Sequence, residues 1–130
     1  RLSSISEILF EGLDAASCKT GLDIGCGAGS TTRRLHKLLG SKSKVVGLDI
    51  SEQLLNLARN VETNELLEFV QADAQSFSFE QQGTDIAISR FGVMFFENPV
   101  KAFENIRSAM KQGGQFRFVC WYIYPKFINF

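Results

Sequence analysis

An acidic residue followed by glycines at alternate positions stands near the start of this chain, in the segment Asp23-Ile24-Gly25-Cys26-Gly27-Ala28-Gly29. Glycines tolerate positive φ and let backbone N–H groups approach a ligand closely, which suits a turn wrapped around a nucleotide-like molecule. The apolar lead-in predicts a strand, and the pattern of residues 30–39 predicts a helix. We therefore expect a ligand-binding turn between a strand and a helix.

Two kinds of ligand compete for such a turn. A dinucleotide fingerprint counted from Gly25 requires its third glycine at position 30, where this chain has Ser30. The carboxylate of Asp23 repels a pyrophosphate but attracts a ligand with an ammonium and a sulfonium group. S-adenosylmethionine is such a ligand, so the spacing favours it, and a nicotinamide-dependent oxidoreductase is the disfavoured alternative.

Strand-like and helix-like segments alternate along the chain, which predicts an α/β fold with a parallel sheet of about five strands. Residues 1–17 contain a leading helix that ends near Gly12. Ser30 and Thr31 suit capping of the next helix, and Gly113-Gly114 suits a turn into the last strand. The predicted strands are 20–24, 45–50, 68–71, 84–89 and 115–121, and the later helices are 30–39, 99–110 and one that begins at 51.

Acidic residues end two of the predicted strands. Because the carboxyl ends of parallel strands meet at one edge of the sheet, ligands bind there, beside the point where strand order reverses. Asp49 can accept bonds from both hydroxyls of a ribose, and Asp73 can accept from an adenine amine. Ile50 and Leu54 offer apolar surface for a purine ring. The backbone after Ser89 faces the reactive end of such a ligand.

In this order the motifs resemble the class I S-adenosylmethionine-dependent methyltransferases, a Rossmann-like family with many small-molecule enzymes, from about Leu22 to Trp121. Gln112 stands where that family often has proline. The resemblance implies that the methionine part binds at Asp23 and the glycine turn. It implies S-adenosylmethionine as cofactor, with the binding residues Asp23, Gly25, Cys26, Gly27, Gly29, Asp49, Ile50, Leu54, Asp73, Ala74 and Ser89.

Catalysis in such a family needs few side chains, because the sulfonium is already activated and alignment does most of the rest. We assign no general base, and Arg90 and Phe91 are catalytic candidates only because they follow the fourth strand. No metal site is expected, since Cys18, Cys26 and Cys120 form no Cys-x-x-Cys pair. His36 is expected on a solvated helix face among basic neighbours.

Composition excludes several classes of partner. Fourteen basic and fourteen acidic residues leave no net charge to attract nucleic acid or an anionic membrane. No run of roughly 18 apolar residues is present, so no membrane span is expected. With 130 residues and 45% hydrophobic content, we expect one domain over 1–130, cytoplasmic and with reduced thiols. Arg1 leaves open whether the chain was processed or cut from a longer one.

The resembled family normally continues past its fifth strand with a helix and two more strands, whereas only residues 122–130 remain here, an apolar tail. A fifth strand at the edge exposes unpaired backbone, so we expect the apolar residues 121–130 either to pack on that edge or to form a homodimer through it with a second copy. The leading interpretation is a methyltransferase that acts on a small molecule. The alternative is a non-catalytic S-adenosylmethionine-binding module, a truncated relative that dimerises.

Overall fold

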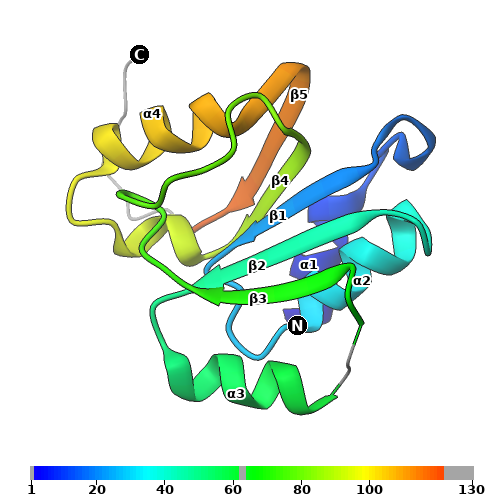
Figure 1. The fold of residues 1–130 in the computed structure, drawn as a ribbon, viewed down its shortest axis with the longest axis horizontal. Helices are drawn as coiled ribbons and strands as arrows, with labels where there is room; N and C mark the ends of the chain where they lie inside the picture. The colour runs from blue at the N-terminus through cyan, green and yellow to red at the C-terminus, as the bar shows by residue number, and fades with distance from the viewer. Residues whose placement is uncertain (1, 62–63, 122–130) are drawn as a thin grey trace.

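A single parallel sheet organises residues 2–61 and 64–121, the part of the chain that this computed structural model describes (Figure 1). The strand order is β3-β2-β1-β4-β5, with every neighbouring pair parallel. This arrangement confirms the predicted α/β fold, while the predicted tail at 122–130 lies outside the described residues. The strands are β1 Thr20–Ile24, β2 Lys44–Asp49, β3 Leu67–Gln71, β4 Thr84–Arg90 and β5 Met110–Val119.

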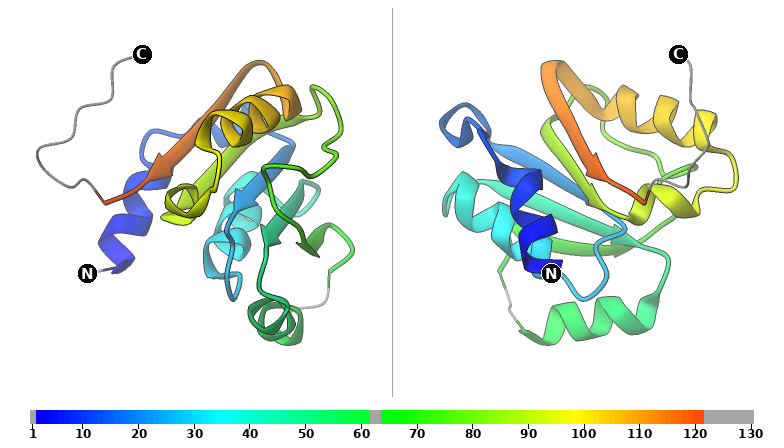
Figure 2. Two further views of the ribbon diagram at one scale, coloured as in Figure 1. Left: turned by 90° about the vertical axis from the view of Figure 1, so that its left-hand side faces the viewer. Right: turned by 180° about the vertical axis from the view of Figure 1, so that it is seen from behind.

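Helices cover both faces of the sheet (Figure 2). The helices α1 (Leu2–Phe10), α2 (Ser30–Leu39) and α3 (Glu52–Val61) pack on one face, and α4 (Pro99–Ala109) packs on the other. A hydrophobic core lies on each face of the sheet, and consecutive residues of β4 contribute to both. Ile86 and Ile88 face the first three helices, and Ala87 faces α4. Strands buried on both faces read as continuous apolar runs, which is why the sequence revealed them.

The entry into β5 differs from the prediction. The strand begins at Met110, directly after α4, and the two glycines at 113–114 lie within it. The partner of β4 shifts by five residues, from Met110 to Gln115, while β4 advances by two, from Thr84 to Ile86, so the register of the two strands is irregular there. The glycines therefore serve an irregular strand instead of a turn before it.

The start and the body of α2 also correct the sequence interpretation. No side-chain bond caps the helix at Gly29, and the hydroxyl of Thr31 instead donates to Asp23. His36 is buried, with Nε2 3.1 Å from the carbonyl oxygen of Ser43. The prediction of a solvated histidine was wrong because the loop before β2 folds against this side of the helix.

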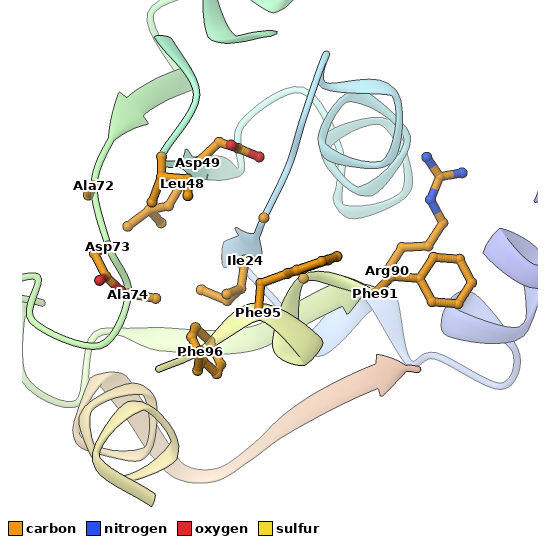
Figure 3. A pocket seen from close by; sticks show the side chains of 13 residues that line it. Ile24, Leu48, Asp49, Ala72, Asp73, Ala74, Arg90, Phe91, Phe95 and Phe96 are labelled. Carbon is orange, nitrogen blue, oxygen red and sulfur yellow. The ribbon is translucent and has the colours of Figure 1, made fainter. Parts of the chain in front are cut away.

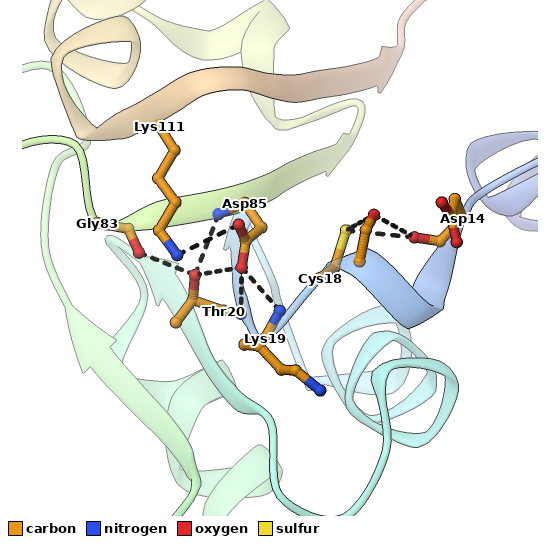
Figure 4. A network of polar contacts seen from close by, with 8 residues as sticks. Asp14, Cys18, Lys19, Thr20, Gly83, Asp85 and Lys111 are labelled. Carbon is orange, nitrogen blue, oxygen red and sulfur yellow. Dashed lines mark hydrogen bonds and ion pairs between the residues drawn. The ribbon is translucent and has the colours of Figure 1, made fainter.

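A polar network fixes the amino-terminal ends of the strands (Figure 4). Asp85 Oδ2 accepts from the backbone N–H of Lys19 at 2.7 Å and of Thr20 at 3.1 Å, and Lys111 Nζ lies 3.3 Å from Asp85 Oδ1. Partial burial raises the pKa of Asp85, but these donors outweigh it and hold the pKa below its usual value. The network joins β1, β4 and β5 at the edge opposite the site described next.

Candidate functional site

A cavity of about 320 Å³ opens at the carboxyl ends of β1, β2, β3 and β4 (Figure 3). Its volume falls within the range of small-molecule pockets, roughly 300–1,000 Å³. It adjoins β1, whose neighbours β2 and β4 lead to opposite halves of the sheet, so it occupies the switch point of the fold. The lining residues are Ile24, Gly25, Leu48, Asp49, Ile50, Ala72, Asp73, Ala74, Arg90, Phe91, Gly92, Phe95 and Phe96.

Two glycines form a backbone crossing at the floor of the cavity. Gly25 has φ +72°, and a Cβ atom on it would lie 2.8 Å from the Cα of Gly92. A Cβ on Gly92 would lie 3.0 Å from the Cα of Gly25 and would overlap the carbonyl oxygen of Ile24. Both positions therefore require glycine. Sequence reasoning missed Gly92, because its partner is distant in sequence; its place directly after a predicted strand was the only signal.

Asp49 links the end of β2 to the glycine turn. Its Oδ2 accepts from the backbone N–H of Gly27 at 2.8 Å, and its Oδ1 accepts from the N–H of Ser51 at 2.9 Å. An ionised carboxylate has about four acceptor sites, so these two bonds leave capacity for a ligand. Asp49 therefore stabilises the turn and also presents acceptor oxygens at the cavity wall.

Asp73 lies in the same cavity wall as Asp49, after β3. Its Oδ1 accepts from the N–H of Gln75 at 2.9 Å, which fixes the carboxylate at the end of the strand. Ala74 and the largely exposed Ile50 also line the cavity, whereas Leu54 lies on the outer face of α3 and does not. Two acids from neighbouring strand ends thus converge on one cavity.

Asp23 is fully buried and does not line the cavity. Its Oδ2 accepts from the hydroxyls of Thr31 at 2.6 Å and Thr32 at 2.8 Å, while its Oδ1 has no partner among the described residues. Burial raises the pKa of Asp23 to about 6, although the two hydroxyls and the charge of Arg90 act in the opposite direction. Asp23 therefore ties β1 to the first turn of α2, directly behind the glycine turn.

Other predicted residues support the cavity from behind. Ser89 is fully buried and donates from Oγ to the carbonyl oxygen of Ile24 at 2.8 Å. The thiol of Cys26 packs against Gly47, and burial raises its pKa above the usual value, while its N–H donates to Leu48 at 2.9 Å. The cavity wall brings together Gly25, Asp49, Ile50, Asp73, Ala74, Arg90 and Phe91; it does not include Asp23, Cys26, Gly27, Gly29, Leu54 and Ser89.

The β4 side of the cavity is aromatic. Phe91 has φ +68°, its N–H donates to Val119 at 2.8 Å, and its ring stacks on Trp121 with centroids 5.2 Å apart. Phe95 is 78% exposed at the cavity and Phe96 lies beside it (Figure 3). The cavity is therefore acidic toward β2 and β3 and aromatic toward β4, apart from Arg90.

Similarity to known proteins agrees with this geometry. The sheet topology and the position of the cavity define an α/β domain of the Rossmann-like class. Residues 22–118 match the family described as methyltransferase domain, so the chain belongs to that family. A solved S-adenosylmethionine-dependent methyltransferase from Mesorhizobium loti superposes with a TM-score of 0.79 and 28% identity, covering 91% of this chain and 55% of that one. S-adenosylmethionine is the cofactor that this family and this structure imply.

Two curated relatives are similar in sequence. The demethylmenaquinone methyltransferase of Lactococcus lactis is 32% identical over 102 residues, which is 76% of this chain and 40% of the relative. The ubiquinone/menaquinone biosynthesis C-methyltransferase UbiE of Wigglesworthia glossinidia brevipalpis is 32% identical over 72% of this chain and 39% of its own length. The chain thus spans about two fifths of the curated relatives it matches. None of the described helices is long and apolar enough to cross a membrane.

Proposed function

We propose that this chain binds S-adenosylmethionine and transfers its methyl group to a small-molecule acceptor. The observation that carries the proposal is the convergence of Asp49 and Asp73, from adjacent strand ends, on the cavity floored by Gly25 and Gly92. Family membership supports the same cofactor. When bound, S-adenosylmethionine supplies a methyl group activated by its sulfonium.

The residues present fit that cofactor. Asp49 keeps acceptor capacity for the ribose hydroxyls after bonding Gly27 and Ser51, and Asp73 offers a carboxylate to the adenine amine. Ile50 gives an apolar surface between them, and a Cβ on Gly27 would meet nothing within 4 Å, so open space lies over the turn. The remaining predicted residues then support the glycine turn and α3 instead of contacting the cofactor; they are Asp23, Cys26, Gly29, Leu54 and Ser89.

The aromatic side of the cavity is proposed for the acceptor. Phe91, Phe95 and Phe96 offer ring surfaces to an uncharged, flat molecule. Quinone-type acceptors are the first to test, because two relatives are named for methyl transfer to such compounds. Rate enhancement then comes from holding the acceptor nucleophile in line with the methyl group, and no described side chain is assigned as general base.

Titration calorimetry tests the proposal. The chain is titrated with S-adenosylmethionine, S-adenosylhomocysteine and NAD, and the first two bind while NAD does not. Methyl transfer is then measured with a demethylated quinol, a phenol and a primary amine. Binding without transfer to any acceptor would favour the alternative, a non-catalytic S-adenosylmethionine-binding module. Binding of NAD alone would overturn the proposal.

We propose that the free edge of β5 pairs with a second copy of the chain. Among the described residues β5 pairs only with β4, and Phe118 and Trp121 are substantially exposed beside this edge. Unpaired strand edges with apolar neighbours favour association. A single domain over 1–130 and a cytoplasmic location also remain proposals, which limited proteolysis and cell fractionation test.

A further inference from the structure

Arg90 is the one basic residue among the described residues that line the cavity. It is partly buried, and within the described part of the chain it makes no ion pair with a carboxylate. Its Nη1 donates to the hydroxyl of Ser6 on α1 at 2.9 Å. A guanidinium carries five N–H donors, so this bond leaves donors for another acceptor. A positively charged fork that makes no ion pair in the described part of the chain, although its charge also acts on the buried Asp23, therefore lines the ligand cavity.

The strand order tells which end of the cofactor reaches this group. Asp49 and Asp73 lie at the ends of β2 and β3, on one side of β1, whereas Arg90 ends β4 on the other side. A nucleoside held by the two acids would leave the β4 side of the cavity to the rest of the cofactor. The amino-acid part of the cofactor, which carries a carboxylate, is the part remote from adenine. The charge of Arg90 is complementary to that carboxylate.

We propose that Arg90 binds the carboxylate of the cofactor's amino-acid part and so selects carboxylated over decarboxylated S-adenosyl nucleosides. The inference rests on the proposed function and names a recognition residue within that site. Planar guanidinium groups bind carboxylates through two parallel hydrogen bonds. This role replaces the earlier expectation of Arg90 as a methyl-transfer residue.

Two local features position the guanidinium for this role. Ser6 holds Nη1 from α1, and the backbone directly after Arg90 is fixed because Phe91 donates its N–H to Val119 of β5 at 2.8 Å. Helix α1 itself is held near its carboxyl end by Arg117, whose Nη1 donates to the carbonyl oxygens of Leu9 at 3.2 Å and Glu11 at 2.6 Å. Arg107, in the last turn of α4 on the other face of the sheet, does not line the cavity, so it provides a matched control.

Calorimetry with two probes measures the selection. S-adenosylhomocysteine carries the carboxylate, and its decarboxylated analogue keeps the ammonium but lacks it. The measured ratio is the Kd of the decarboxylated probe divided by the Kd of S-adenosylhomocysteine. We expect this ratio to fall about ten- to hundredfold in Arg90→Met, since a charge-assisted bond contributes roughly 1.5–3 kcal/mol. The decarboxylated probe should bind the variant about as it binds the original chain. Arg107→Met, which removes the same charge on the other face of the sheet, should leave the ratio unchanged.

The outcomes distinguish two roles of Arg90, carboxylate binding and the anchoring of α1. A ratio unchanged in Arg90→Met, or equal weakening of both probes, would assign Arg90 to anchoring α1 and overturn the inference. Should Arg90→Met fail to fold by circular dichroism, Arg90→Gln replaces it, with the same expected loss of the ratio. Failure of the original chain to bind S-adenosylhomocysteine would instead refute the proposed function, so the two failures are distinguishable.

Discussion

Replacing Gly92 by alanine tests the backbone crossing at the cavity floor. The added Cβ would lie 2.8 Å from Ser89 Oγ and 3.0 Å from the Cα of Gly25, whereas ordinary contacts begin at 3.4 Å. The ends of β1 and β4 must therefore separate by roughly 1 Å, because the same Cβ would also overlap the carbonyl oxygen of Ile24 and contacts this short are repulsive. Overpacking of this kind costs about 1–3 kcal/mol of unfolding free energy. A displaced floor should also weaken cofactor binding by at least about tenfold, since a 1 Å misplacement can cost about a hundredfold.

The assay pairs urea unfolding with calorimetric titration of S-adenosylhomocysteine. Gly12→Ala is the control: Gly12 has φ +66°, but a Cβ there meets nothing within 4 Å. Alanine at that position costs about 1–2 kcal/mol of backbone strain and should leave affinity unchanged. Gly92→Ala with the original affinity and stability would refute the crossing as a requirement of the site.

Three further predictions follow from named contacts. Asp49→Asn should weaken S-adenosylhomocysteine binding about tenfold or more by calorimetry, because it removes a charged acceptor; an unchanged Kd would exclude a ribose role. The folded-state pKa of Asp23 is raised to about 6 from 3.8, so its stabilising protonation is complete below pH 4 and is lost as pH rises toward 6. Urea unfolding should reveal up to about 3 kcal/mol of this loss, absent in Asp23→Asn; an identical pH profile in that variant would count against it. Pairing through β5 predicts twice the chain mass by light scattering, and Phe118→Lys, at an exposed edge side chain, should return the monomer.

The sequence predicted the fold because the relevant signals are local. The buried apolar run of β4 and the periodic apolar pattern of α3 each predict their own element, and Ser51 caps α3, with Oγ accepting from the N–H of Leu54 at 3.2 Å. Pro99 likewise lies in the first turn of α4. Such elements depend on neighbours within a few residues, so one sequence suffices to find them.

The features that sequence reasoning missed arise from contacts between distant segments. The burial of His36 depends on the loop that holds Ser43, although its basic neighbours in sequence indicated solvent. The need for glycine at position 92 depends on the end of β1, and the bond between Arg90 and Ser6 joins the end of β4 to the first helix. Helical or strand periodicity carries no information about such pairs.

The candidate site contains residues whose place in the fold the sequence predicts and one whose position it does not predict. Asp49 and Asp73 were recognisable because each lies at the carboxyl end of a predicted strand or just beyond it, and parallel strand ends meet at one edge. Asp23 instead turns away from the cavity and accepts from Thr31 and Thr32. The sequence does not reveal this orientation, since alternation along a strand does not tell which face the ligand approaches. The acid in the motif therefore supports the turn from within the fold.

A crystal structure of the chain with S-adenosylhomocysteine tests the central claim most directly. We expect the ribose at Asp49, the adenine between Ile50 and Asp73, and the thioether over the Gly25–Gly92 crossing. A nucleoside bound away from the ends of β2 and β3, with these two acids in contact only with solvent, would contradict it.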